Sequence, residues 1–118
     1  MSLSGRLAIV TGGGSGIGKA VCHALAGDGA TVVVADINIE AARGTAAELK
    51  GEAHAAFYVD VGDSSSVAAL MSNVSSQCRA PLSIVVNCAG VDKQCAVVDT
   101  TEHDYDELLR VNLKVSYI

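Results

Sequence analysis

The sequence lacks the features that mark membrane proteins, nucleic-acid-binding proteins and metalloproteins. Its apolar runs are only a few residues long, too short to cross a bilayer or to serve as a signal peptide. A net charge of −5 and the absence of a basic block argue against nucleic acid or an anionic membrane surface as a partner. The histidines share no metal-ligand spacing with one another or with the cysteines, so we predict no metal site. We expect an intracellular protein.

Aromatic side chains are also scarce, with three tyrosines, one phenylalanine and no tryptophan in 118 residues. Alanine, valine and glycine are abundant instead, which suits closely packed layers of strands and helices. No C-x-x-C pair occurs, and in a core-rich chain without an export signal we expect the cysteines to be reduced and buried. They are Cys22, Cys78, Cys88 and Cys95.

Short apolar runs alternate along the chain with helical repeats. Strands are predicted at 7–11, 31–36, 54–60 and 82–87. Helices are predicted at 16–27, 39–50, 64–79 and after Thr101, with Asn38 and Asp63 as N-terminal caps. Repeated strand–helix units predict an α/β fold, a Rossmann-type doubly wound parallel sheet with helices on both faces. Residues 1–118 are expected to form a single domain of this kind.

The predicted fourth strand is apolar on both faces. Alternation places Leu82, Ile84 and Val86 on one face and Val85 on the other. Such a strand is typically central, yet nothing after it in the sequence reads as a strand. We therefore interpret the domain as incomplete, truncated after the fourth strand and the start of the following helix. It would be a natural short isoform, a fragment or an incomplete gene product.

A glycine-rich turn lies between the first strand and the first helix. It reads Thr11-Gly-Gly-Gly-Ser-Gly-Ile-Gly18. Such a turn lets a ligand approach the backbone and directs the helix's free N–H groups and positive dipole end at a phosphate. Asp36 ends the second strand, where a carboxylate would accept hydrogen bonds from the adenosine ribose and repel a 2′-phosphate. With no cation at Ser15 or Ile37, the pattern favours NAD over NADP.

Two other interpretations of the turn stay open. Residues 13–19 match a nucleoside-triphosphate P-loop up to its last position, where Ala20 replaces the hydroxyl that would hold Mg²⁺. A glycine-rich turn without any ligand is the other alternative. The strand before it, the helix after it and Asp36 in register favour the dinucleotide site over both.

The order of the motifs resembles the short-chain dehydrogenases/reductases over essentially the whole chain. After the glycine turn come Asp60-Val61, Asn87-Cys88-Ala89-Gly90 and Val111-Asn112. Cys88 stands where many members of the family have a second asparagine. The resemblance implies that the pyrophosphate is held by Gly12, Ser15, Gly16, Ile17 and Gly18, and the ribose by Asp36. It also implies that the adenine edge is contacted by Asp60 and Val61, and that the rest of the cofactor lies along Asn87, Ala89 and Gly90. Asn112 would support a water-linked proton relay. From the residues alone, Asp60 also reads as a turn residue and Asn112 as an interior amide.

The resemblance also implies what this chain does not contain. The family uses a serine to orient the substrate carbonyl and a Tyr-x-x-x-Lys pair to transfer the proton, and no Tyr-x-x-x-Lys occurs here. We therefore expect the 118-residue chain alone to show no turnover. Within the family, the chain resembles the 3-oxoacyl-carrier-protein reductases. Among these it is similar to the type-eight 17β-hydroxysteroid dehydrogenases, through His54-Ala-Ala-Phe57, Cys88-Ala-Gly-Val91 and Val111-Asn-Leu-Lys114. That likeness implies NAD(H), 3-oxoacyl thioester or steroid carbonyl substrates, an oligomer, and the cytoplasm or mitochondrial matrix. The oligomer expected for the full-length form is a homo- or hetero-oligomer. The alternative is a non-catalytic truncated isoform that acts as a binding or interaction protein.

Overall fold

The computed structural model describes residues 2–89 and 102–103. Its strands are β1 (Leu7–Thr11), β2 (Thr31–Asp36), β3 (Ala55–Tyr58) and β4 (Leu82–Asn87). Its helices are α1 (Gly16–Gly27), α2 (Ile39–Glu48) and α3 (Ser64–Gln77). Every predicted element up to residue 89 is confirmed in type. β3, α2 and α3 are shorter than predicted by two or three residues, because their ends are turns and extended backbone.

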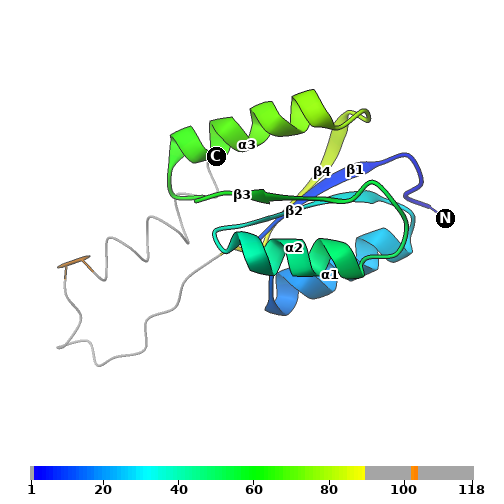
Figure 1. Ribbon diagram of the computed structural model, residues 1–118, viewed down its shortest axis with the longest axis horizontal. Helices are drawn as coiled ribbons and strands as arrows, with labels where there is room; N and C mark the ends of the chain where they lie inside the picture. The colour runs from blue at the N-terminus through cyan, green and yellow to red at the C-terminus, as the bar shows by residue number, and fades with distance from the viewer. Residues whose placement is uncertain (1, 90–101, 104–118) are drawn as a thin grey trace.

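The four strands form one parallel sheet in the order β3-β2-β1-β4. Figure 1 shows α1 and α2 on one face of this sheet and α3 on the other. This is the doubly wound Rossmann-like arrangement predicted from the repeated strand–helix units. The chain leaves β1 for one face through α1 and reaches β4 from the other face through α3.

The sheet separates two apolar clusters. Val10, Val32 and Val34 face α1 and α2, where they pack with Cys22, Ala26 and Ala42. Leu7, Ile9 and Val33 face the other way and pack with Leu70 and Val74 of α3. Because β1 and β2 are buried on both faces, their sequences are continuous apolar runs rather than alternating ones.

The buried face of α1 differs from the apolar spacing in its sequence. Ile17, Ala20 and Ala24 recur at helical intervals, yet all three are exposed. The buried stripe is Gly18, Cys22 and Ala26. Small residues make an ambiguous pattern on a helix, and the close approach of this helix to the glycine turn is what selects the inward face.

A bulge at the start of β4 changes the predicted faces of that strand. Leu7 pairs with Leu82 but Ala8 pairs with Ile84, so Ser83 is skipped in the register. Arg6 Nε donates a hydrogen bond of 2.8 Å to Ser83 Oγ at this point. As a result Leu82 packs against the cluster on the α3 face, whereas Val86 packs against the cluster beneath α1. The prediction that both lie on one face was therefore wrong, because a bulge breaks the period of two.

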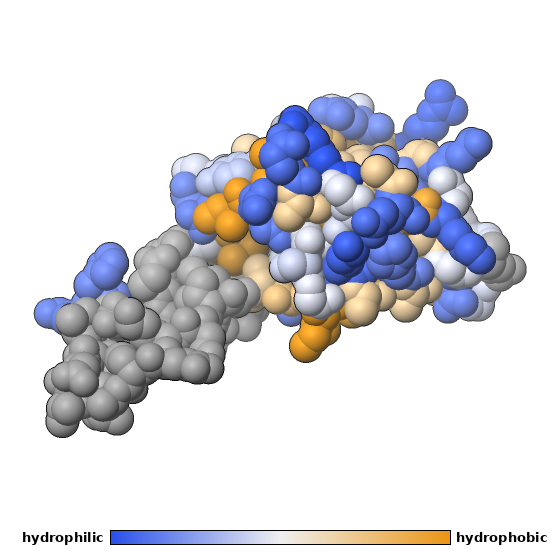
Figure 2. Space-filling model, turned by 60° about the horizontal axis from the view of Figure 1, so that its bottom comes forward, coloured by the Kyte–Doolittle hydropathy of each residue, from blue (hydrophilic) through white to orange (hydrophobic). Residues whose placement is uncertain are grey.

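The outer surface over α1 and α2 is mixed, with exposed charged side chains on α2 and mostly small or apolar exposed residues on α1. Figure 2 shows hydrophilic side chains there, interspersed with small apolar areas. Within the described residues, no helix is long and apolar enough to cross a membrane. The same residues contain no group of three or more histidine, cysteine or acidic side chains able to hold a metal ion.

Candidate functional site

The predicted site residues follow the carboxyl ends of the strands and so meet at one edge of the sheet. The register pairs Thr11 of β1 with Ala35 of β2 and with Asn87 of β4. The connection from β1 to its neighbour β2 runs over one face of the sheet, and the connection that leads to its other neighbour, β4, runs over the opposite face. The space between the ends of β1 and β4 is therefore the topological switch point of the sheet. Ligands of open α/β sheets bind in the crevice at this place.

The glycine turn fits closely between β1, β4 and α1. Gly12 has a φ of +69°, and a Cβ there would lie 2.7 Å from the backbone nitrogen of Ala89. A Cβ at Gly18 would collide with the carbonyl oxygen of Gly12. Glycine at these two positions is thus required by the approach of protein backbone to protein backbone, whether or not a ligand is bound.

Gly16 requires a different explanation. Its φ is +55°, which disfavours a side chain, yet among residues 2–89 and 102–103 no neighbouring group would lie within 4 Å of a Cβ there. Ser15 precedes α1 in extended conformation and makes no side-chain capping hydrogen bond. The first turn of α1 therefore points N–H groups into open space beside an exposed glycine, an arrangement suited to an anion.

Asp36 links the glycine turn to the turn after β2. Its Oδ2 accepts a hydrogen bond of 2.9 Å from the backbone N–H of Gly14, and its Oδ1 accepts one of 3.0 Å from Asn38 N–H. A carboxylate can accept about four hydrogen bonds, so two accepting positions remain for ligand hydroxyls. Gly14 was not singled out in the sequence, although a Cβ there would lie 2.8 Å from Asp36 Oδ2.

Exposed isoleucines lie beside the glycine turn and beside Asp36. Ile17 is 79% exposed at the start of α1 and Ile37 is 61% exposed after Asp36. Large apolar side chains left in water beside a polar turn are candidates for contact with the flat faces of a ligand. Ile37 also provides no positive charge beside Asp36.

Asp60 and Val61 lie in the turn between β3 and α3. Asp60 Oδ1 accepts from Gly62 N–H at 3.0 Å, and the backbone N–H of Asp60 donates to Ser66 Oγ at 2.8 Å. Asp60 therefore does serve as a turn residue. The side chain of Val61 is buried against α3, so only its backbone is left for a ligand. Ser66, which holds this turn, could have been found only from its position in the first turn of α3.

The end of β4 lies beside the glycine turn. Cys88 N–H donates to Thr11 O at 3.1 Å, and Thr11 Oγ1 donates to Asn87 Oδ1 at 3.4 Å. Asn87 is exposed, whereas Ala89 packs partly against the α3-side cluster. Gly90 and Asn112, the other two predicted site residues, lie outside the described residues.

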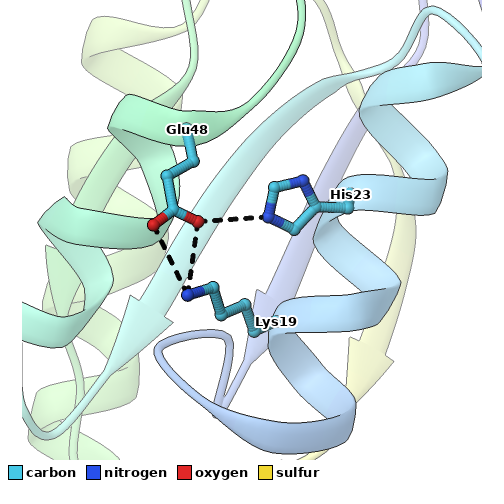
Figure 3. A network of polar contacts seen from close by, with 3 residues as sticks. All are labelled: Lys19, His23 and Glu48. Carbon is cyan, nitrogen blue, oxygen red and sulfur yellow. Dashed lines mark hydrogen bonds and ion pairs between the residues drawn. The ribbon is translucent and has the colours of Figure 1, made fainter.

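Lys19 is directed away from the glycine turn. Its Nζ lies 3.2 Å from Glu48 Oε2, and His23 Nε2 lies 3.3 Å from the same oxygen. Figure 3 shows these side chains bridging α1 and the end of α2. A P-loop needs its lysine on the phosphates, so this pairing argues against the triphosphate alternative.

Comparison with known proteins agrees with this geometry. A family model described as short chain dehydrogenase matches residues 6–118. The chain belongs to the short-chain dehydrogenase family. It is 38% identical over 125 residues to the human (3R)-3-hydroxyacyl-CoA dehydrogenase. This alignment covers 98% of this chain and 48% of the human protein.

Two solved structures are similar to the described fold. A short chain dehydrogenase/reductase family protein superposes with a TM-score of 0.87 at 32% identity, covering 99% of this chain and 47% of the other. A protein crystallised as ribose-5-phosphate isomerase from Brucella melitensis 16M superposes with a TM-score of 0.89 at 34% identity, covering 99% and 45%.

Members of the short-chain dehydrogenase family are oxidoreductases that bind nicotinamide dinucleotides. The chain spans about half the length of the curated relatives it matches. The family match, over residues 6–118, therefore includes the glycine turn and Asp36.

Proposed function

We propose that this chain is the dinucleotide-binding half of an NAD-dependent oxidoreductase that interconverts a carbonyl group and a secondary alcohol. The observation that carries the proposal is the hydrogen bond between Asp36 and Gly14, which places a carboxylate directly against the glycine turn. The glycine turn suits phosphate, and the Asp36 carboxylate suits ribose hydroxyls. A nicotinamide cofactor, when bound, supplies a hydride acceptor or donor.

The described residues fit such a cofactor. The open space at Gly16 and the uncapped start of α1 would receive the pyrophosphate, with Gly12, Ser15, Ile17 and Gly18 shaping the turn. Asp36 would bind the adenosine ribose. Asp60 and the Val61 backbone would contact the adenine, and Asn87 and Ala89 would lie along the rest of the cofactor. Gly90 and Asn112 belong to the same proposal.

The preference for NAD over NADP follows from charge. Asp36 would repel the 2′-phosphate of NADP, and neither Ser15 nor Ile37 beside it offers a cation to neutralise that phosphate. Its two hydrogen bonds hold the carboxylate at the turn, so it cannot easily move aside.

The substrate is proposed from relatives. A (3R)-3-hydroxyacyl thioester and its 3-oxo counterpart are suggested by the name of the human relative. Steroids are a second class, proposed from the motif resemblance in the sequence. We infer that proton transfer requires a Tyr-x-x-x-Lys pair, which this sequence does not contain. The chain by itself would therefore bind cofactor without turnover. A non-catalytic binding protein remains the alternative, and it too would show binding without turnover.

Fluorescence titration of the purified chain with NADH, NADPH and ATP–Mg²⁺ tests the proposal. We expect saturable binding of NADH, at least tenfold weaker binding of NADPH, and none of ATP–Mg²⁺. Equal affinity for NADH and NADPH would refute the NAD preference. Absence of any dinucleotide binding by a folded chain, judged by circular dichroism, would refute the function itself.

A further inference from the structure

Two thiols lie beneath the glycine turn. Cys22 is fully buried on the sheet-facing side of α1, and Cys88 is partly buried directly after β4. Both pack in the apolar cluster that contains Val10 and Val34. They come from elements 66 positions apart in sequence, and neither takes part in the proposed contacts with the dinucleotide.

Both cysteines lie next to the glycine turn. A Cβ at Gly13 would lie 3.0 Å from Cys22 Sγ, and a Cβ at Gly12 would lie 2.8 Å from the carbonyl carbon of Cys88. The Cys22 sulfur and the Cys88 backbone are therefore close to two successive residues of the turn. A hydrogen bond of 3.1 Å from Cys88 N–H to Thr11 O keeps the end of β4 at this place.

Burial makes the Cys22 thiol difficult to ionise. Burial, and then the negative charge of a nearby Cys88 thiolate, raise the pKa of the Cys22 thiol to about 11. Cys22 is thus protonated at neutral pH. Cys88 is the more accessible of the two, so an oxidant in solution would meet Cys88 first.

We propose that Cys22 and Cys88 form a reversible disulfide when the protein meets a hydroperoxide, and that this bond weakens dinucleotide binding at the glycine turn. The disulfide rests on the packing of both cysteines with one apolar cluster beside the glycine turn. Its effect on binding rests on the function proposed above. Cys78 is not part of the pair, because it packs on the opposite face of the sheet with α3.

The chemistry needs only the peroxide. The Cys88 thiolate attacks one peroxide oxygen, the O–O bond breaks, and water or an alcohol leaves with a proton, which converts Cys88 to a sulfenic acid. The Cys22 sulfur then bonds to the Cys88 sulfur as the S–O bond breaks, and water leaves with the Cys22 proton. The peroxide gains two electrons, and the two thiols together lose two.

The new bond would constrain the turn from below. A disulfide accepts only a narrow range of Cβ separations and torsion angles, so its formation sets the distance between α1 and the end of β4. Gly12 and Gly13 lie between these elements, with little room to adjust. By thermodynamic linkage, a dinucleotide that binds the reduced form better will in turn oppose disulfide formation.

Peptide mapping can identify the disulfide without ambiguity. Cleavage after lysine and arginine places each cysteine on its own peptide, namely residues 20–43, 51–79, 80–93 and 94–110. The chain is treated with hydrogen peroxide, its remaining thiols are blocked with N-ethylmaleimide in denaturant, and it is digested without reductant. We expect peptide 20–43 linked to peptide 80–93. The link should be lost in Cys22→Ala and in Cys88→Ala but kept in Cys78→Ala.

The effect on binding is measured on the same samples. We expect the oxidised chain to bind NADH about tenfold more weakly than the reduced chain, with recovery after dithiothreitol and slower oxidation in saturating NADH. Blocked thiols on both peptides, or a link from peptide 80–93 to another peptide, would overturn the disulfide. Equal NADH affinity before and after oxidation would overturn its effect. A reduced chain that binds no dinucleotide would count against the proposed function, while the peptide link would still decide the pairing.

Discussion

The carboxylate of Asp36 and the backbone N–H of Gly14 are joined by a hydrogen bond of 2.9 Å. This bond connects the end of β2 to the turn that follows β1, across 22 positions of sequence. A second bond, from Asn38 N–H, holds the other carboxylate oxygen. Asp36 therefore supports the shape of the turn as well as offering acceptors to a ligand, and its substitution should affect both.

Asp36→Ala should relax the choice of cofactor. Loss of a charged hydrogen-bonding group costs about 1.5–3 kcal/mol, so we expect NADH affinity to fall roughly tenfold or more. NADPH affinity should fall less or rise, because the repulsion of its 2′-phosphate is gone. Titration with both cofactors measures this. Asp28→Ala, at an exposed aspartate after α1, is the matched control. An unchanged NADH-to-NADPH ratio in Asp36→Ala would contradict the assignment.

Gly16→Val should abolish dinucleotide binding. A branched side chain would occupy the open space beside the uncapped start of α1, at a φ of +55° that disfavours it. Gly44→Ala is the control, since Gly44 lies within α2 and, in the part of the chain that the structure describes, no neighbouring group lies within 4 Å of its missing Cβ. That change should stabilise the fold by about 1 kcal/mol and leave binding intact. If a folded Gly16→Val variant binds NADH normally, the site is elsewhere.

His54→Ala should destabilise the fold by about 1–3 kcal/mol. Nδ1 of His54 accepts from the N–H of Val32 at 3.0 Å, and Nε2 lies 2.6 Å from Lys50 O, so Nε2 carries the hydrogen. Val32 is buried, and its N–H would lose this acceptor. Urea denaturation measures the change, with exposed His23→Ala as the comparison. A loss no larger than that of His23→Ala would show that this bond contributes little.

The cluster of Lys19, His23 and Glu48 should contribute stability that depends on pH. The hydrogen bond and charge of Lys19, and then the hydrogen bond of His23, hold the pKa of Glu48 below its ordinary value of 4.5. Because the folded-state pKa is lowered, the contribution is present above pH 4.5 and is lost as pH falls through the lowered pKa. Glu48→Gln should therefore lower the denaturation midpoint at pH 7 and lower it less at pH 3. At high salt the effect at pH 7 should be small, because the charged side chains are exposed. Glu52→Gln, at an exposed glutamate outside the cluster, is the control. An equal loss at both pH values would contradict the prediction.

Thr45→Val should stabilise the protein by about 1 kcal/mol. Thr45 is only 1% exposed in α2, and its hydroxyl has no hydrogen-bond partner among the described residues. Valine has nearly the same shape without the buried polar group. Thr45→Ser, which keeps the hydroxyl and removes the methyl group, should instead destabilise. Thermal denaturation of the three proteins distinguishes these outcomes, and a less stable Thr45→Val would indicate that the hydroxyl is hydrogen-bonded.

Local patterns along the chain were enough to predict the elements and much of the site. The apolar runs of β1 and β2, the caps Asn38 and Asp63, and the glycine turn each depend on neighbours within a few residues. Parallel strands then bring the residues after each strand to a common edge, so the meeting of Gly12 with Asp36 and Asn87 could be anticipated.

Contacts between distant segments could be determined only by the tertiary structure. The inward face of α1 depends on where Gly18 meets Gly12, which the spacing of alanines does not reveal. The bulge at Ser83 depends on Arg6, 77 positions away. The same holds for the hydrogen bond between Gly14 and Asp36, and for Cys22 and Cys88 beneath the turn. The sequence by itself determined which segments become strands, helices and turns, because those preferences are local. Which backbones touch, and therefore which glycines and thiols share a site, was decided by packing across the sheet.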